Sequence, residues 1–391
     1  IDSALCAAMA VDALGADRYR IYWAIGGSLL GGARGMAMTG FWSARLGLKT
    51  TFAAGLLLFS LGALLCTFAT SAEGMAPWRL VSGYGTGLVL CAGMLVLWRD
   101  FGADEELAMT LYGMGLYLSA LLGVILGGLL LARVGWQALF LIEFPRGAGA
   151  PALAAPLLPA DAARETTARA AVARFDVIGL GLLAGFVLSL VPVVVLGHYW
   201  GWLDSPFFVP WGFGFAVASV AFVAWGTLAA RPLVDLRPLA RRNFGLGLAG
   251  KAIFSVNLFV VLSLLSGYMV GARGYQWWQG GLVFAPALFT MGAAMLAGAR
   301  FGRDPDRKLR IFLGLALMSA VTWQLGRVDL YTSKVWLASW LSLWGAGAGL
   351  AVADRAQAHA VIHAGRDAQG DGGDALAAPG TVAMAAGLVH G

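Results

Sequence analysis

Long apolar runs, separated by short polar segments, recur along the whole chain. A helix of about 20 residues spans the roughly 30 Å hydrocarbon core of a bilayer and satisfies its own backbone groups there. Only 12% of the residues are charged and the mean hydropathy is +0.76, whereas about a quarter of the residues in a soluble domain are charged. The sequence therefore predicts an all-α integral membrane protein that crosses the bilayer many times.

The apolar runs also indicate where the membrane spans lie. The first residue is Ile and the first run is only about half a span long, so we expect the printed sequence to begin inside its first helix. A further span is expected to start near residue 381. The other predicted spans cover, approximately, residues 1–14, 21–40, 50–70, 78–98, 107–131, 137–158, 177–197, 207–230, 244–270, 277–299, 310–327 and 335–355.

Basic residues are concentrated in every second polar segment. The positive-inside rule places these segments in the cytoplasm, and with them the N-terminus that we expect ahead of the printed sequence. The basic residues neither share one face nor alternate with aromatic residues, so nucleic acid is not an expected partner. The segments assigned to the cytoplasm contain Arg45, Lys49, Arg99, Arg164, Arg169, Arg174, Arg231, Arg237, Arg241, Arg242, Arg300, Arg303, Arg307, Lys308 and Arg310.

The longest polar segment between clear spans, residues 159–176, divides the chain. We expect an N-terminal six-helix bundle over residues 1–158 with a shortened first helix. A cytoplasmic linker and two extra helices are expected over residues 159–243. The C-terminal bundle is expected over residues 244–391, with its last helices truncated or missing.

Segments 40–49 and 298–310 form a weak internal repeat: a small residue ends a helix, basic residues follow, and a helix begins again. Such repeats are typical of proteins built from two related helical bundles.

The cysteines Cys6, Cys66 and Cys91 all lie in apolar runs, and none has a partner at metal-ligand spacing. Clusters of His, Cys or carboxylate residues are also absent from the predicted spans. The sequence therefore predicts no metal site, no catalytic residue and no enzyme.

Glycine-rich signatures occur in a fixed order along the first half of the chain. Small residues let helices approach closely, and cations at a cytoplasmic helix end can hold a neighbouring helix C-terminus. The signature residues are Gly40, Arg45, Gly47 and Lys49 in GFWSARLGLK, Arg79 in WRLVSGYGTG, Gly123, Gly127 and Gly128 in LLGVILGG, and Glu143 in FLIEFPRG.

These signatures, with Asp2 in the first run and RPLVDLRPLARRNF at 231–244, resemble the major facilitator superfamily and, within it, the fourteen-helix branch of drug/proton antiporters. The resemblance implies the major facilitator fold, with two six-helix bundles and two extra central helices, working by alternating access. It also implies conformational roles for the 40–49 loop and the glycines of the fifth helix. No cofactor is implied besides the proton gradient. Glu143 stands where this branch usually has Asn.

Ionisable residues within spans suggest a binding site, because a charge at the bilayer centre is costly without a partner or water. Counted at about 1.5 Å per residue, Asp2, Arg34 and Lys251 lie at similar depth and could line one cavity at the midplane. Asn257 and Tyr117 are polar residues that could join the substrate site. Hydrogen bonding between helices is the alternative for both.

Proton coupling needs a carboxyl group that alternately holds and releases a proton. Asp2 is the first candidate, and Glu143 is the second. Arg79 lies too near the outer end of its helix for direct contact with Asp2, which leaves a contact through Glu143 or water. An ion pair between Glu143 and Arg146, one helical turn apart, is the structural alternative.

The sequence thus predicts a secondary transporter of the bacterial cytoplasmic (inner) membrane that exports amphipathic drugs or toxic compounds. The cations Arg34 and Lys251 favour substrates with negative charge on an apolar body. The expected partners are a small amphipathic substrate, the lipid bilayer and a periplasmic adaptor protein. A lipid or fatty-acid flippase, a membrane-bound enzyme and a non-transporting membrane sensor are the alternatives.

Overall fold

The computed structural model describes helices and the turns between them. It covers residues 18–101, 133–154, 176–196, 204–206, 208–230, 232–240, 242–301 and 307–352, with isolated positions between 112 and 130. Among these residues there are no strands, and six helices are long and apolar enough to cross a membrane. The prediction of an all-α, multi-pass membrane protein is confirmed.

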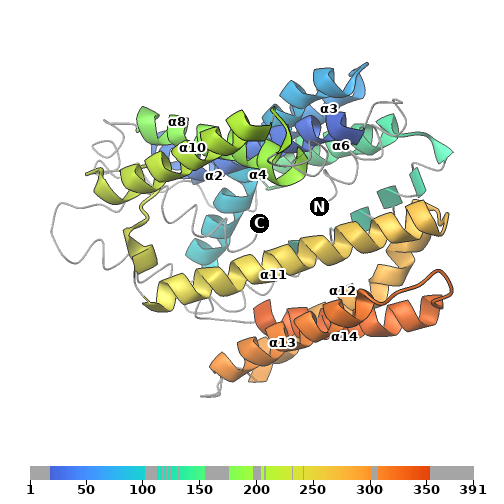
Figure 1. Ribbon diagram of the computed structural model, residues 1–391. Coiled ribbons are helices and arrows are strands. Elements are labelled where there is room, and N and C mark those ends of the chain that lie inside the picture. Colours follow the sequence, from blue (N-terminus) through green and yellow to red (C-terminus); the bar gives the residue numbers. More distant parts are fainter. Residues whose placement is uncertain are drawn as a thin grey trace.

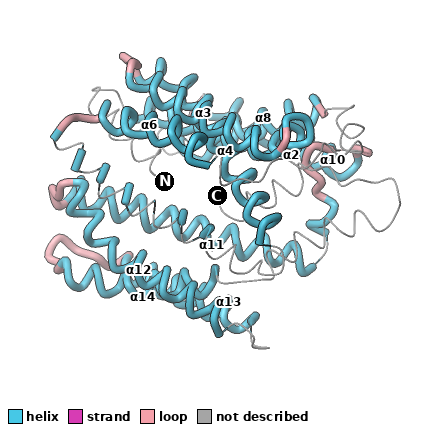
Figure 2. The backbone as a smooth tube through the Cα atoms, turned by 180° about the vertical axis from the view of Figure 1, so that it is seen from behind, coloured by secondary structure: helices cyan, strands magenta, loops and turns pink. Residues whose placement is uncertain are grey.

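The N-terminal helices form one packed group (Figures 1 and 2). It consists of α2 (Arg18–Leu46), α3 (Leu48–Thr67), α4 (Ala72–Phe101) and α6 (Gln137–Ala154). Helix α4 lies at its centre, because it packs along both α2 and α3, while α6 packs on α3.

A helical hairpin lies beside this group. It consists of α8 (Val177–Val191), which continues as a π-helical turn (Pro192–Leu196), and α10 (Phe208–Leu228). The two helices pack on each other, and α8 also contacts α2.

The C-terminal helices form a second group in the lower half of Figure 1. A 3-10 turn, η4 (Arg237–Ala240), leads into it. Helix α14 packs along both α12 and α13, and α11 contacts α13. The helices are α11 (Arg242–Gly267), followed by the π-helical turn η5 (Tyr268–Ala272), α12 (Trp277–Phe301), α13 (Arg307–Leu325) and α14 (Lys334–Val352).

The segment 40–49 differs from its prediction as a loop. Helix α2 continues through it to Leu46, and α3 begins at Leu48. The break is at Gly47, whose φ of 91° lies in the left-handed region that favours glycine. A helix can extend beyond its apolar run because polar side chains at a bilayer interface do not interrupt its hydrogen bonds.

Glycines allow α2 and α4 to meet backbone to backbone. A Cβ on Gly31 would lie 2.1 Å from the carbonyl oxygen of Leu80, and one on Gly87 would lie 2.3 Å from that of Gly32. Close packing of this kind drives helices to associate in lipid, because the hydrophobic effect does not favour helix–helix contact over contact with lipid tails.

The same arrangement joins α12 and α14. A Cβ on Gly345 would lie 1.9 Å from the carbonyl oxygen of Ala287, and one on Gly349 would lie 2.4 Å from that of Met291. In both groups, therefore, a pair of glycines one helical turn apart packs against the backbone of a partner helix: Gly31 and Gly35 on α2, and Gly345 and Gly349 on α14. This likeness in packing accompanies the weak repeat of the sequence.

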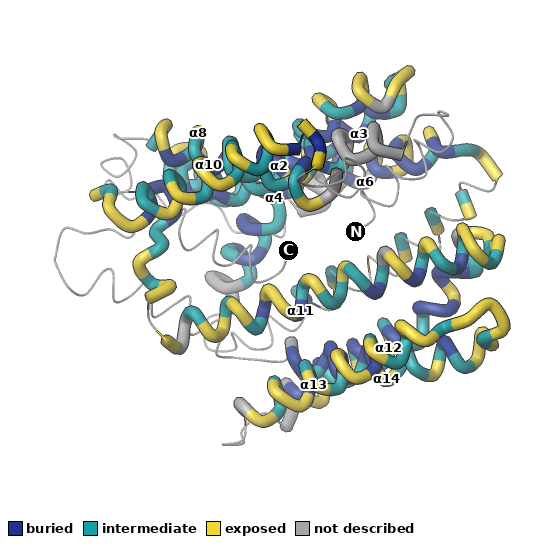
Figure 3. The backbone as a smooth tube through the Cα atoms, viewed as in Figure 1, coloured by how far each residue is buried: buried dark blue, intermediate teal, exposed yellow. Residues whose placement is uncertain are grey.

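Exposed residues, yellow in Figure 3, recur along the helices, and many of them are large and apolar. Phe213 and Val220 on α10 and Phe289 on α12 are 70% or more exposed. In a soluble protein such surfaces would promote association, but here they suit contact with lipid tails.

Candidate functional site

A buried arginine is the most unusual feature of the N-terminal group. Arg79, on α4, has 0% exposure. Its guanidinium carbon lies 5.2 Å from the centre of the Phe140 ring on α6. Among the described residues, none accepts a hydrogen bond from its three side-chain nitrogens. A charge buried in this way is costly, so the site around it is a functional candidate.

Glu143 belongs to the same site. It is 5% exposed on α6 and follows Phe140 by one helical turn, so the two side chains share a face. Both Arg79 and Glu143 lie close enough to the thiol of Cys66, on α3, to act on it electrostatically. Three helices therefore bring one cation and one carboxyl group into a common buried region, here called the Arg79–Glu143 site.

Lys251 is the second buried cation. It is 5% exposed on α11, and its Nζ lies 4.8 Å from the centre of the Phe254 ring. Within the described part of the chain it forms no ion pair. The aromatic face supplies some attraction for the ammonium, yet it cannot replace a full counter-charge.

Asn257, expected in the substrate site, ties helices together in the structure. Its side-chain oxygen accepts hydrogen bonds from the Thr322 hydroxyl (3.2 Å) and from Nε1 of Trp344 (2.9 Å). These bonds join α11, α13 and α14. The geometry corresponds to the alternative role of hydrogen bonding between helices.

Arg34 lies on α2, partly buried, and its Nε donates no hydrogen bond to a described residue. Arg34 and Lys251 lie on helices of different groups, and Asp2 lies outside the described residues. That these three residues lie at the same depth in the membrane thus stays a prediction.

The 40–49 signature has a simple geometry. Gly40 is buried and Arg45 is exposed, with its guanidinium carbon 5.8 Å from the ring of Phe41. Gly47 makes the break between helices, and Lys49 lies in the first turn of α3. The region has the form of a helix-to-helix corner with basic residues on either side.

Signature residues of the fifth helix are described only in part. Gly123 and Gly127 are helical, and a Cβ on Gly127 would meet the side chain of Leu139 on α6 at 3.5 Å. Gly128 and Tyr117 lie outside the described residues.

A carboxylate that sequence reasoning missed connects the hairpin to the loop after it. Asp176 accepts hydrogen bonds from the backbone N–H of Gly179 (2.8 Å), Nε1 of Trp225 (3.0 Å) and the backbone N–H of Leu233 (2.8 Å). It thereby caps α8, holds the end of α10 and positions the loop. An Asp directly before an apolar helix is an N-cap signal, but nothing local to it indicates the other two donors.

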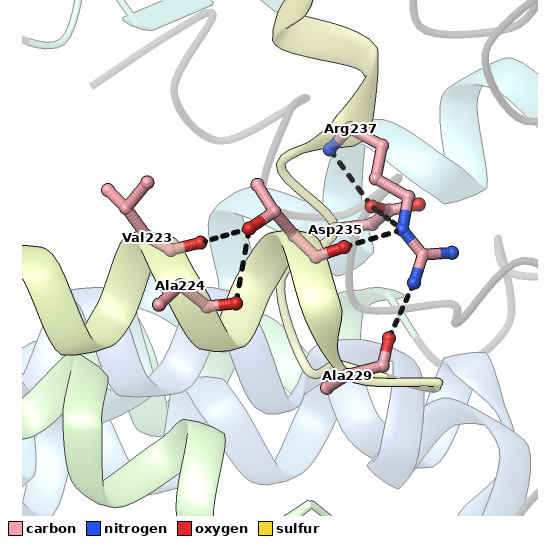
Figure 4. A network of polar contacts seen from close by, with 6 residues as sticks. Val223, Ala224, Ala229, Asp235 and Arg237 are labelled. Carbon is pink, nitrogen blue, oxygen red and sulfur yellow. Dashed lines mark hydrogen bonds and ion pairs between the residues drawn. The ribbon is translucent and has the colours of Figure 1, made fainter.

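The loop after α10 is fixed by a second set of contacts, shown in Figure 4. Nε of Arg237 donates to the carbonyl oxygen of Thr227 (3.0 Å), and an Nη donates to that of Ala229 (2.6 Å). The Arg237 side chain also lies 3.9 Å from Asp235. These carbonyls lack partners within α10, so the guanidinium caps the helix C-terminus.

Buried side chains of the same loop reach the N-terminal group. Leu233 and Val234 pack with Ala37 of α2 and Leu183 of α8. The hairpin, its loop and α2 therefore share a small core.

Curated proteins similar to the chain are named as resistance proteins. The Multidrug resistance protein B homolog of Mycobacterium tuberculosis is 29% identical over 310 residues, covering 78% of this chain and 56% of that protein. The probable multidrug resistance protein EmrY of Escherichia coli is 25% identical, covering 79% of the chain and 60% of its own length. The chain thus spans somewhat more than half the length of these relatives.

Solved structures show a similar arrangement of helices. The proton:xylose symporter XylE matches with a TM-score of 0.55 at 13% identity, covering 100% of this chain and 80% of that one. The tetrameric PepTSo2 matches with a TM-score of 0.56 at 16% identity, covering 99% and 90%. At such low identity these matches show the fold alone.

The match to a protein family extends over almost the whole chain. Residues 2–387 match the family described as the Major Facilitator Superfamily. Membership of this family, in which the relatives above are multidrug resistance proteins, agrees with the resemblance carried by the glycine signatures. The chain belongs to the Major Facilitator Superfamily.

Proposed function

We propose that the protein is a secondary transporter that exports amphipathic drugs or toxic compounds in exchange for protons, by alternating access. Family membership and the names of its relatives support export of drugs. One further relative, 27% identical over 312 residues, is the methylenomycin A resistance protein of Streptomyces coelicolor. We place the protein in the bacterial cytoplasmic membrane, with a periplasmic adaptor protein as a partner.

The Arg79–Glu143 site is the observation that carries proton coupling. Glu143 attracts the buried guanidinium when ionised and loses this attraction when protonated. A proton entering from the outside thus changes how strongly α6 is held to α4, because Glu143 lies on α6 and Arg79 on α4. The proton returns to water when the site opens to the cytoplasm. Asp2 is the other carboxyl group proposed for this cycle.

Buried Lys251 supports a substrate with negative charge on an apolar body. Its ammonium lies against an aromatic ring and forms no ion pair among the described residues. The acidic group of an amphiphile would supply the missing counter-charge for Lys251. Its apolar body would contact the apolar side chains around the site. Weak-acid drugs and fatty acids both have this chemistry.

The experiment is proton-driven transport in proteoliposomes. Glu143→Gln and Asp2→Asn keep the shape of each side chain but remove the titrating group. We expect at least one of the two to abolish accumulation driven by a pH gradient while substrate binding persists. Glu73→Gln is the matched control, because Glu73 lies exposed in the first turn of α4 and should transport as the wild type does.

Two results would contradict the proposal. Wild-type proton-driven flux in both Glu143→Gln and Asp2→Asn would exclude these carboxyl groups as coupling sites. Translocation of labelled lipid by a protein that moves no soluble amphiphile would favour a flippase on the same fold.

A further inference from the structure

Two cations share one aromatic ring at the end of the C-terminal group. The guanidinium carbon of Arg273 lies 5.2 Å from the centre of the Tyr275 ring, and Nζ of Lys334 lies 4.5 Å from the same centre. The charges are therefore separated by no more than about one Debye length, which is ~10 Å at moderate salt. Neither forms an ion pair within the described residues, so their mutual repulsion is not offset by a carboxylate there.

This arrangement is built by two turns that are bonded to each other. The hydroxyl of Tyr268 donates to the carbonyl oxygen of Asp329, and the guanidinium of Arg273 donates to that of Thr332. Figure 1 shows the α11–α12 and α13–α14 turns at the same end of the group. Gly274, with φ of 63°, allows the sharp turn of the backbone between Arg273 and Tyr275. The guanidinium of Arg273 is thus held in place by a backbone contact between the two turns, while the ammonium of Lys334 lies against the Tyr275 ring.

The acidic residue of these turns, Asp329, forms hydrogen bonds within its own turn and does not pair with the two cations. Asp329 accepts hydrogen bonds from the Thr332 hydroxyl (2.8 Å) and from the backbone N–H of Tyr331 (3.1 Å). The hydroxyl contact lowers the pKa of this carboxyl, so it stays ionised while serving the turn. It lies beyond ion-pair distance of both cations.

Exposed apolar side chains lie next to the cations in the sequence and on the surface. Val335 follows Lys334 in the first turn of α14 and is 79% exposed, and Leu330 is 60% exposed. The N-terminus of α14 adds the positive end of its helix dipole. Cationic groups beside exposed apolar side chains match an amphiphile with an anionic head.

The position of these cations adds a second argument. The charge bias of the sequence predicts that the turns after α11 and α13 face away from the cytoplasm, where basic residues are few. Arg273, Arg327 and Lys334 are exceptions to that bias, so membrane topology does not account for them, and of the three only Arg273 and Lys334 lie against one ring.

We propose that Arg273, Tyr275 and Lys334 form a binding site for the phosphate of an anionic phospholipid headgroup in the leaflet facing away from the cytoplasm. The guanidinium and ammonium donate to the phosphate oxygens, and the Tyr275 ring holds both cations in place. The exposed apolar side chains contact the lipid chains. This site is separate from the Arg79–Glu143 site.

Native mass spectrometry of the full chain in neutral detergent tests the proposal. The probes are phosphatidylglycerol and phosphatidylcholine with the same acyl chains. We expect Arg273→Gln/Lys334→Gln to bind phosphatidylglycerol roughly tenfold more weakly, because charge-assisted hydrogen bonds are lost. Binding of phosphatidylcholine should change much less, because its choline cation is repelled by the same two side chains and offsets the attraction of its phosphate. Lys334→Arg keeps the charge and should bind as the wild type does.

Arg327→Gln is the matched control. Arg327 is at the same end of the group and also faces a ring, 5.8 Å from the centre of Trp323. Its replacement removes the same charge outside the proposed site and should leave phosphatidylglycerol binding intact. If the double variant does not fold, Lys334→Gln replaces it, since Lys334 is an exposed side chain at the start of α14.

Three results would overturn the proposal. The first is equal affinity of wild type and double variant for phosphatidylglycerol. The second is an equal loss in Arg327→Gln, which would indicate general surface charge. The third is displacement of the lipid by inorganic phosphate at equal concentration, which would show a site for free anions and not for lipid.

Discussion

Thr290 donates a hydrogen bond of 2.7 Å from its hydroxyl to the backbone carbonyl oxygen of Ser342, and this joins α12 to α14. In the N-terminal group, Gly31 on α2 meets the backbone carbonyl of Leu80 on α4 with no side chain between the two helices. The residue after Thr290, Met291, meets Gly349 on α14 through its carbonyl oxygen. The residue after Gly31, Gly32, meets Gly87 on α4 in the same way. Both groups therefore pack two helices backbone to backbone at glycines. In the C-terminal group the Thr290 hydroxyl adds a hydrogen bond to this contact.

Replacement of Gly31 by Ala should destabilise the N-terminal group. The added Cβ would lie 2.1 Å from the carbonyl oxygen of Leu80, so α2 and α4 would have to separate. Overpacking of this kind costs typically 1–3 kcal/mol. The expected result is a lower melting temperature of the purified protein in detergent.

Gly214→Ala is the control for that measurement. No atom lies within 4 Å of a Cβ at Gly214, on α10. Since Ala is the better helix former, this variant should melt at or slightly above the wild-type temperature. Equal melting of Gly31→Ala and Gly214→Ala would show that the close contact of α2 with α4 is absent.

The positions of most helices could be predicted from the sequence because the bilayer sets their length. The predicted span 277–299 corresponds to α12 (Trp277–Phe301), and 335–355 to α14 (Lys334–Val352). The end of α2 could not be predicted in this way, because polar residues beyond the apolar run continue the helix as far as Leu46. Hydropathy marks the membrane boundary, and Gly47 marks the helix boundary.

The candidate site could be predicted only as single residues. Ionisable residues in apolar runs pointed to Glu143, Arg79 and Lys251, whose burial the structure now describes. The partners could not be found in this way, because they come from distant parts of the chain. Phe140 meets Arg79 across two helices, and Trp344 reaches Asn257 from a helix 87 residues later.

Removal of the Asp176 carboxylate should loosen the hairpin and its loop. Asp176→Ala leaves the donors of Gly179, Trp225 and Leu233 without their acceptor. Loss of an N-cap alone costs about 1 kcal/mol, and each further donor left unsatisfied adds to it. We expect faster proteolysis between residues 229 and 241 and a lower melting temperature. Asp204→Ala, at an exposed position before α10, should change neither; if both variants behave alike, the Asp176 contacts do not hold the loop.

Membrane topology is tested with thiol reagents that cannot cross the bilayer. The bias of basic residues predicts that Tyr331→Cys, at a position 94% exposed, is labelled from outside intact cells. Leu239→Cys, between α10 and α11, should be labelled only after permeabilisation. The native thiols of Cys66 and Cys91 are buried, and a Cys6→Ser background removes the third cysteine, which lies outside the described residues. Labelling of both introduced cysteines from one side would show that the count of spans between them is wrong.

Lys251→Met tests the charge of the substrate. Methionine removes the ammonium but keeps much of the length and apolar bulk, so packing against Phe254 should change little. If Lys251 meets an anionic substrate, affinity for an acidic amphiphile should fall about tenfold or more, because a hydrogen bond to a charged group contributes roughly 1.5 to 3 kcal/mol. A neutral amphiphile of the same size should bind equally well, and a cationic one equally or better.

Lys251→Arg separates charge from shape in the same binding assay. It keeps the positive charge at a buried position on α11, so it should retain most of the affinity for the acidic amphiphile. Loss of affinity in both variants would indicate that the exact geometry of the ammonium matters more than its charge. Unchanged affinity in Lys251→Met would exclude an anionic substrate at this position, and the contact with Phe254 would then be a structural one, because the ring already compensates part of the burial.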